Sequence, residues 1–284
     1  MLTNFKEMLW DAYKGHYAVG SFNAYSYDTF KGIIEANRKA GNRPTIAAFG
    51  AKYLSNMSLD DAFAMVESIG KSAPDMQICL HLDHCKDFDI ICQAIRAGFG
   101  SVMYDGSALP FEENLKNTAR VCEIAHACGV SVEAELGSLA AGQYSHEGEA
   151  TDEEIYTDPE KAAEFIASTG VDALAVSVGT VHGLYKGTPK VRVDILQKIN
   201  EAAKIPLVLH GGSGIPEDII SSCIKNGITK INVNTEISVF AGNKLKERLM
   251  AADKIPHLSV LALDQQKDVE EVVSKYISFF GATD

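Results

Sequence analysis

The chain has 284 residues, of which 46% are hydrophobic and 23% charged, an ordinary composition for a globular protein. Its net charge of −12 argues against nucleic acid or an anionic membrane surface as a partner. The length suits either two modest domains or one α/β barrel.

The six cysteines form no C-x-x-C pair, and most lie in apolar runs. We therefore expect reduced thiols and a cytoplasmic location. The N-terminal segment carries acidic side chains in an amphipathic pattern, so we expect no signal peptide. No apolar run approaches the roughly 20 residues that a membrane span needs.

Short apolar segments alternate with segments of helical periodicity along the whole chain. Those that indicate strands are residues 17–25, 45–50, 76–84, 101–107, 131–137, 173–181, 206–214 and 230–236. Several segments between them begin with Ser, Asp or Pro and end with Gly, which are start and stop signals of helices. Apolar strands that alternate with helices indicate a parallel sheet covered on both faces.

This alternation of eight strands with helices favours a TIM (β/α)₈ barrel that forms a single domain over residues 1–284. An extra helix is expected near residues 265–280. No G-x-G-x-x-G motif follows the first strand, which argues against the alternative of a dinucleotide-binding fold. Residues 138–157 form a long, acidic connection after the fifth strand, and connections of this length are usually functional or disordered. We expect a mobile active-site loop there.

Polar side chains stand at the ends of these apolar strands. In chain order they are Asn23, Asp83, His84, Asp105, Glu135, His182, His210 and the segment 232–236. Barrel enzymes build their active sites at the C-terminal ends of strands, so these side chains would meet at one mouth. Three imidazoles with an open position are the pattern of catalytic zinc.

We therefore expect His84, His182 and His210 to be metal ligands. A single histidine at a strand end is more often a structural residue, and the convergence of three favours the metal. His81 lies deeper in its strand and is expected in the core or behind the ligands.

Glycines follow two of these histidines, in the segments 181–187 and 210–218. Unhindered backbone N–H groups beside a helix start form an anion site, and the loops after strands seven and eight often hold phosphate in this fold. Gly212 and its neighbours would converge with Ser213, Asn232 and Thr235. The alternative is that these glycines only bend the chain.

The chain resembles, essentially from end to end, the class II, metal-dependent ketose-bisphosphate aldolases, which include the fructose- and tagatose-bisphosphate enzymes. The motifs that carry the resemblance are GSFNAY, HLDHC, SVMYDGS, VSVEAELG, VDALAVSVGTVHGLYKG, PLVLHGGSGIP and KINVNTE. The resemblance implies a homodimer or homotetramer. It also implies reversible cleavage of a ketose 1,6-bisphosphate to dihydroxyacetone phosphate and glyceraldehyde 3-phosphate.

The same resemblance implies roles for single residues. The three histidines would bind catalytic Zn²⁺, and Asp105 and Glu135 would belong to an alternative metal position nearby. Asp83 would exchange a proton with the C4 hydroxyl. The residues implied to contact substrate, with a monovalent cation (Na⁺ or K⁺) near their loops, are Asn23, Gly183, Gly211, Ser213, Asn232, Asn234 and Thr235.

Chemistry supports the role of Asp83 separately. Cleavage of a carbon–carbon bond next to a ketone leaves an enediolate, which a metal stabilises as a Lewis acid, and it needs a base on the neighbouring hydroxyl. Asp83, next to His84, supplies that base. A metal-free aldolase would use a Schiff-base lysine, but Lys230 begins its predicted strand and so lies at the wrong end.

The chain departs from the family in the long loop and in its C-terminal part. Gln143 and Tyr144 stand where the family has a glutamate that moves the proton of the dihydroxyacetone carbon. We expect Glu147 or Glu149 to replace it, although both also read as solvated charges. Ser238 stands where some members carry a basic residue for the second phosphate, and the acidic-Pro-Arg segment of the tail is missing.

These departures leave two alternatives. One is a sister aldolase whose aldehyde half lacks the usual phosphate. The other is a metal-binding barrel with reduced catalysis.

Overall fold

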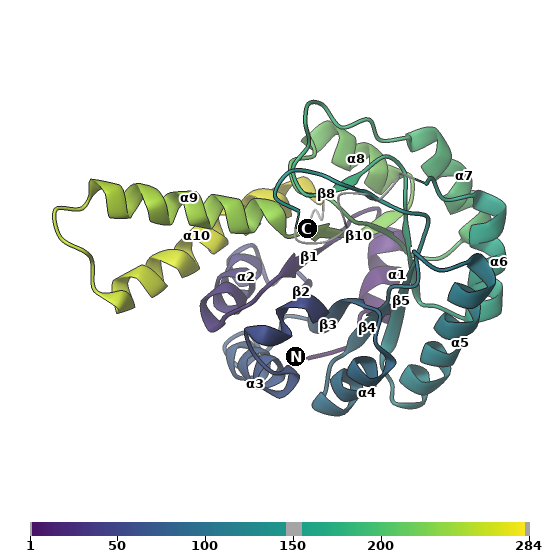
Figure 1. Cartoon of the computed structure of the whole chain (residues 1–284), viewed down its shortest axis with the longest axis horizontal. Helices are drawn as coiled ribbons and strands as arrows, with labels where there is room; N and C mark the ends of the chain where they lie inside the picture. The colour runs from purple at the N-terminus through teal and green to yellow at the C-terminus, as the bar shows by residue number, and fades with distance from the viewer. Residues whose placement is uncertain (1, 146–154, 282–284) are drawn as a thin grey trace.

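The computed structural model describes residues 2–145 and 155–281. Within these ranges, parallel strands close into an eight-stranded barrel in the order β1-β10-β9-β7-β5-β4-β3-β2 (Figure 1). The barrel strands are β1 (Val19–Asn23), β2 (Thr45–Gly50), β3 (Ile78–Cys85), β4 (Ser101–Tyr104), β5 (Ser131–Leu136), β7 (Ala173–Val176), β9 (Leu207–Leu209) and β10 (Ile228–Val233). The predicted TIM barrel is confirmed.

Helices surround this barrel on its outer face. They are α2 (Tyr27–Lys39), α3 (Leu59–Gly70), α4 (Phe88–Ala97), α5 (Phe111–Ala127), α6 (Pro159–Thr169), α7 (Val193–Ala203) and α8 (Glu217–Lys225), with a 3₁₀ turn η1 (Ala51–Ser55) after β2. Polar residues cap the N-termini of several helices, as expected. Ser26 and Ser58 each form a capping box, and Asp87 and Asp158 accept hydrogen bonds from backbone N–H groups of the first turn. No helix in the described ranges is long and apolar enough to span a bilayer.

Most strand boundaries differ from the expectation by a few residues, and the last three expected strands differ as follows. The sixth strand ends at Val176, and Val181–His182 form a separate short strand, β8, that pairs with β6 (Ala140–Ala141) in a two-stranded sheet. The seventh strand ends at Leu209, so the glycine-rich segment after it is a turn. The eighth begins two residues earlier than predicted, at Ile228. Apolar character alone does not distinguish a strand from the buried turn that continues it.

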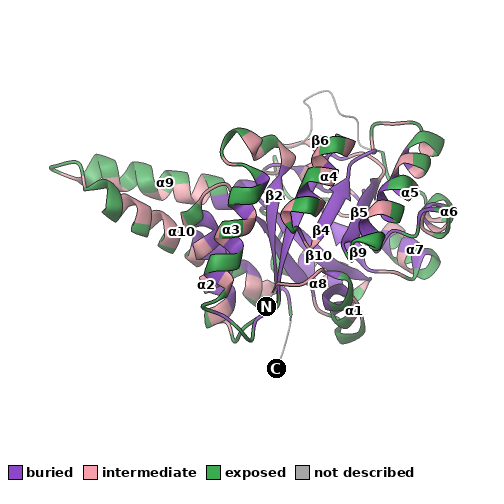
Figure 2. Cartoon of the chain, turned by 90° about the horizontal axis from the view of Figure 1, so that it is seen from below, coloured by how far each residue is buried: buried purple, intermediate pink, exposed green. Residues whose placement is uncertain are grey.

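The end of the barrel opposite to β6 is closed by α1 (Lys6–Gly15) (Figure 2). The N-cap residue Phe5 and the helix side chains Met8 and Leu9 are buried against the inward-facing residues of the lower barrel, which include Ile46 and Val208. This layer is apolar, whereas the layers above it carry charged groups. The barrel interior is therefore a filled core with its polar part toward the C-terminal strand ends.

The helices α9 (Thr235–Ala251) and α10 (Leu258–Phe279) form a hairpin that projects away from the barrel (Figure 1). Helix α10 returns toward the barrel and packs against β1, α2 and α8. The expected extra helix is thus present but begins earlier, and α9 was not expected. Apolar side chains stay exposed on the projecting part, among them Met250, Ile255 and Leu258.

Candidate metal and catalytic site at the barrel mouth

The end of β3 brings two neighbouring polar residues to the same side. Successive strand residues normally point to opposite faces, so Asp83 and His84 should diverge. His84 has a left-handed backbone with φ of 46°, and the register with β4 shifts between Leu82 and Cys85. Irregularities of this kind re-aim side chains beside active sites. The kink lets both Asp83 and His84 face the mouth.

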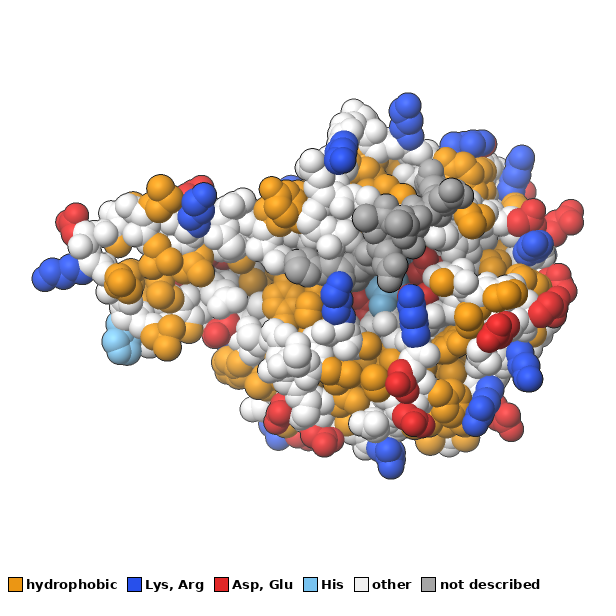
Figure 3. All heavy atoms as spheres, viewed as in Figure 1, with side chains coloured by type: hydrophobic (Ala, Val, Ile, Leu, Met, Phe, Trp, Pro, Cys, Tyr) orange, Lys and Arg blue, Asp and Glu red, His pale blue; other side chains and the backbone are white. Residues whose placement is uncertain are grey.

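The three candidate histidines come from the end of β3, from β8 and from the turn after β9, and they meet there. The rings of His84 and His210 have centroids 4.6 Å apart, and those of His84 and His182 are 5.0 Å apart. One ring nitrogen from each lies within 4.8 Å of the others. Figure 3 views this face and shows a histidine side chain in the hollow, with acidic side chains close by.

The donor set suits a divalent transition metal. His84 Nε2 and His210 Nδ1 lie 2.8 Å apart, and both ring nitrogens of buried His182 lack a hydrogen-bond partner among the described residues. Burial, followed by the neighbouring His84 and His210, lowers the pKa of His182 well below its usual value, so the ring is neutral as a metal ligand must be. His210 Nε2 faces Glu133 Oε1 at 2.8 Å, which leaves Nδ1, the nitrogen that faces His84, as the ligand atom.

A second group of ligand atoms shares His84. His84 Nδ1 lies 3.1 Å from Asp105 Oδ2, and Glu135 completes a set whose atoms also lie within 4.8 Å of one another. Burial, and then the charge of Asp105, raises the pKa of Glu135 to about 8. Two carboxylates this close favour a cation between them. The structure thus brings all five predicted metal residues together.

Asp83 is fully buried and is held by two side-chain amides. Asn23 Nδ2 donates to Oδ2 at 2.9 Å, and Asn232 Nδ2 donates to Oδ1 at 3.2 Å. Burial alone would raise the pKa of Asp83, but the nearby charges of His84 and Lys230 outweigh it and hold the pKa below its usual range. Asp83 is therefore an ionised acceptor with a fixed carboxylate plane.

Sequence reasoning missed a layer of charge beneath these residues. Glu133 and Lys230 are fully buried, and their charged atoms lie 2.8 Å apart. The prediction that Lys230 begins its strand is wrong, because it is the third residue of β10 and lies in the barrel interior. Its two-residue spacing from Asn232, like that of Glu133 from Glu135, is the signal that could have identified the layer. His81, as expected, lies in this layer behind the ligands, with Nδ1 2.8 Å from Ser101 Oγ.

The glycine-rich turns lie beside the first turn of α9. Gly211 has φ of 70°, and a Cβ there would lie 2.2 Å from the carbonyl oxygen of Val181, so only glycine fits this contact. Ser213 Oγ accepts from the backbone N–H of Glu236, and Thr235 is the first residue of α9. Gly183, Gly212, Ser213, Asn232, Asn234 and Thr235 all belong to these turns or the adjoining strand and helix ends.

The start of the long loop is described, but its centre is not. Gln143 forms a bridge with Leu184, and Tyr144 is 68% exposed with φ of 56°. Glu147 and Glu149 lie outside the described residues. Neither described residue at the start of the loop is a carboxylate, which leaves the expected proton-transfer group of the loop unassigned.

A family model described as class-II fructose-bisphosphate aldolase matches residues 3–284. A fructose-bisphosphate aldolase of Geobacillus stearothermophilus is 41% identical over 257 residues, which cover 89% of this chain and 87% of that protein. A fructose-bisphosphate aldolase of Staphylococcus aureus is 37% identical over 289 residues, which cover 99% and 98% of the two chains.

Two solved structures agree with this match. The crystal structure of the YdjI aldolase from Escherichia coli K12 superposes with a TM-score of 0.87 at 34% identity and covers 99% of this chain and 98% of that one. A putative fructose-1,6-bisphosphate aldolase from Coccidioides immitis has a TM-score of 0.86 at 28% identity and covers 96% and 94%.

Proposed function

The chain belongs to the class II fructose-bisphosphate aldolase family, a family of metal-dependent lyases, and we propose that it uses zinc to cleave a ketose 1,6-bisphosphate. The substrate would be fructose or tagatose 1,6-bisphosphate, cleaved reversibly to dihydroxyacetone phosphate and glyceraldehyde 3-phosphate. The convergence of three imidazoles beside a buried, ionised Asp83 carries this proposal.

The proposed zinc ligands are His84, His182 and His210. The unpartnered ring nitrogens of His182 and the lowered pKa values of His182 and His210 support the assignment, as does Glu133 behind His210. A zinc ion held by them supplies Lewis-acid stabilisation of the charge that develops on the ketone side of the broken bond. Asp105 and Glu135 would serve an alternative metal position that shares His84.

Asp83 is the proposed proton acceptor at the C4 hydroxyl. Its ionised state suits a base, and the two amides that fix its carboxylate plane keep it beside the ligand cluster. In the reverse direction it returns the same proton to the new hydroxyl. Asn23 would hold Asp83 in place and also contact the substrate.

The turns after β8 and β9 and the first turn of α9 would bind the dihydroxyacetone phosphate end. Backbone N–H groups near a helix N-terminus favour an anion, and the lack of Cβ atoms in Gly183, Gly211 and Gly212 allows close approach. Ser213 would add a hydroxyl donor. Asn232, Asn234 and Thr235 would also contact this end of the substrate, with Na⁺ or K⁺ near the same loops.

Glu149 or Glu147 would supply the base at the dihydroxyacetone carbon. The supporting observation is that Gln143 and Tyr144, which precede them, carry no carboxylate. Residues 138–157 would act as a lid that excludes water when it closes.

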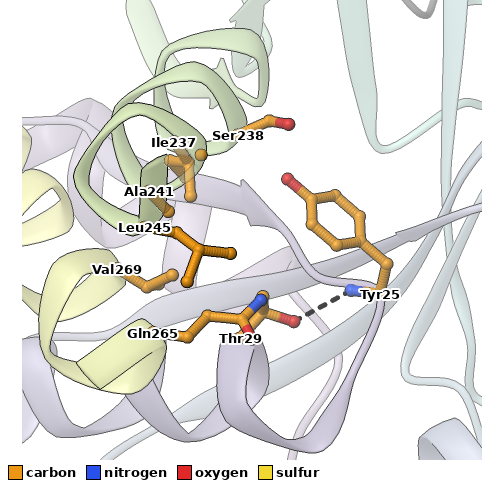
Figure 4. Close-up of a pocket in the computed structure, with 9 residues that line it drawn as sticks. Tyr25, Thr29, Ile237, Ser238, Ala241, Leu245, Gln265 and Val269 are labelled. Carbon is orange, nitrogen blue, oxygen red and sulfur yellow. Dashed lines mark hydrogen bonds between the residues drawn. The ribbon is translucent and has the colours of Figure 1, made fainter. Parts of the chain in front are cut away.

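A second candidate is a sister aldolase whose aldehyde half lacks a phosphate. A cavity of about 140 Å³ lies between the β1–α2 corner and the helices α9 and α10 (Figure 4). Its polar lining side chains are those of Tyr25, Thr29, Ser238 and Gln265, and its lining residues include no Lys or Arg. A lining without basic side chains suits an uncharged polyol at the aldehyde end of the substrate better than a second phosphate.

The proposed assembly is a homodimer or homotetramer in the cytoplasm. The projecting hairpin exposes apolar side chains, including Met250, Ile255 and Leu258 at 77%, 87% and 77%. Exposed apolar surface of this kind is usual where protein surfaces associate.

The test is release of dihydroxyacetone phosphate, measured with a coupled dehydrogenase. We expect activity with fructose or tagatose 1,6-bisphosphate, its loss after treatment with a chelator, and its recovery with Zn²⁺ but not Mg²⁺. A panel of ketose 1-phosphates that lack the second phosphate distinguishes the two candidates. Full activity after complete metal removal would contradict both.

A further inference from the structure

Lys230 is a fully buried lysine inside the barrel, below the candidate ligands. Buried ammonium groups are rare unless they are paired, because the transfer of a charge out of water is unfavourable. Its Nζ lies 2.8 Å from Glu133 Oε2 and 2.6 Å from Asn232 Oδ1. With no exposed surface, it cannot reach a substrate carbonyl and does not act as a Schiff-base lysine.

The contact with Lys230 determines which way the Asn232 amide points. An ammonium group only donates, so the Asn232 atom that faces it must be the carbonyl oxygen. The amide nitrogen then faces the mouth, where it donates to Asp83 Oδ1 at 3.2 Å. An Asn232 amide rotated by 180° would place an acceptor against a carboxylate and would release Asp83 on that side.

The second contact of Lys230 acts on the histidine cluster. Glu133 uses Oε2 for Lys230 and Oε1 for His210 Nε2, at 2.8 Å each. Rotation of this carboxylate would break both the ion pair with Lys230 and the contact with His210, so the two contacts together favour one ring plane of His210. One ammonium group therefore supports both sides of the site.

We propose that Lys230 is a positioning residue that aims the Asn232 amide at Asp83 and holds Glu133 on His210. The inference rests on the proposed aldolase function. A purely stabilising role is a poor explanation, because apolar residues often replace a buried ion pair without loss of stability.

The test compares Lys230→Met with wild type in two partial reactions. Cleavage of fructose 1,6-bisphosphate needs Asp83, whereas proton exchange of dihydroxyacetone phosphate with deuterated water does not. We expect cleavage to fall about 10- to 100-fold, the usual range for residues behind the ligands, with a smaller loss of exchange. The dissociation constant of zinc, from chelator competition, should rise by about the same factor.

The matched control is Ile231→Ala, on the same strand but on the opposite face, where Ile231 packs in the outer core. It should lower the melting temperature and leave both the ratio of exchange to cleavage and the zinc affinity unchanged. If Lys230→Met does not fold, the same two measurements are made on the double variant Lys230→Met with Glu133→Gln, which removes both charges of the pair.

A double-mutant cycle with Asp83→Asn tests whether Lys230 affects cleavage through Asp83. If Lys230 acts on cleavage through Asp83, Lys230→Met should cost little further cleavage in the Asp83→Asn background. The proposal requires both the changed ratio and the weaker zinc binding, and the absence of either overturns it. The zinc measurement holds even if wild type cleaves no ketose bisphosphate, which would instead refute the proposed function.

Discussion

Replacement of Asp83 by asparagine removes the proposed base with almost no change of shape. Asp83 accepts one amide N–H on each oxygen, from Asn23 and Asn232. An asparagine has only one acceptor oxygen, so its own amide N–H₂ group would face the N–H₂ group of either Asn23 or Asn232. That mismatch should cost about 1–3 kcal/mol of unfolding free energy, the price of an unsatisfied buried group.

The loss of the base should have a larger effect on the reaction. Removal of a general base typically costs about 10²- to 10⁴-fold, so we expect kcat for ketose bisphosphate cleavage to fall by that factor. Zinc content should stay near that of wild type, because Asp83 is not among the proposed ligands. Proton exchange into dihydroxyacetone phosphate should fall far less than cleavage.

The measurements are coupled-enzyme rates, exchange followed by NMR, and thermal unfolding. Asn23→Ala is the matched control, since it removes one partner of Asp83 but keeps the carboxylate, and its loss of cleavage should be smaller. Equal losses of cleavage and exchange in Asp83→Asn would refute the assignment of Asp83 to the C4 hydroxyl.

Other expectations follow from the same site. His182→Ala should lose both bound zinc and activity, and full zinc retention by metal analysis would rule out His182 as a ligand. The double replacement Glu147→Gln with Glu149→Gln should slow deuterium exchange into dihydroxyacetone phosphate, and an exchange rate equal to wild type would place the base elsewhere. Tyr276→Phe removes the hydroxyl that accepts from Gly214 N and bonds Glu236, and we expect a higher KM for the phosphate substrate with little change in kcat. Leu258→Glu should shift sedimentation toward a smaller assembly and retain full zinc, and an unchanged sedimentation coefficient would exclude the hairpin from the interface.

The eight-strand rhythm and the strand-end residues could be predicted because barrel geometry forces strand ends to one mouth. That rule brought His84 and His210 together although they lie 126 positions apart in the chain. It did not predict how Asp83 and His84 both face inward. That depends on the left-handed backbone at His84, which strand alternation cannot reveal.

The projecting hairpin was also beyond sequence reasoning. The segment that becomes α9 has charged and apolar residues on most sides, and its buried residues, Thr235 and Ile237, both lie at its N-terminal end. A helix without one continuous buried face lacks the periodic signal on which prediction depends. The early part of α10, with Leu258 and Val260 exposed, has the same property.

The charged layer beneath the mouth can be explained by the needs of a histidine metal site inside a barrel. Three neutral imidazoles must each present a lone pair, and a partner such as Glu133 must hold the N–H of the ring. A carboxylate at that depth needs a counter-charge, because burial disfavours its ionised form. Lys230 supplies the counter-charge, and the pKa of Glu133 falls to about 2 as the charge of Lys230 and the bond to His210 outweigh its burial. Strand alternation places Lys230 one layer below Asn232 and Glu133 one layer below Glu135, so the same periodicity that builds the mouth also builds its support.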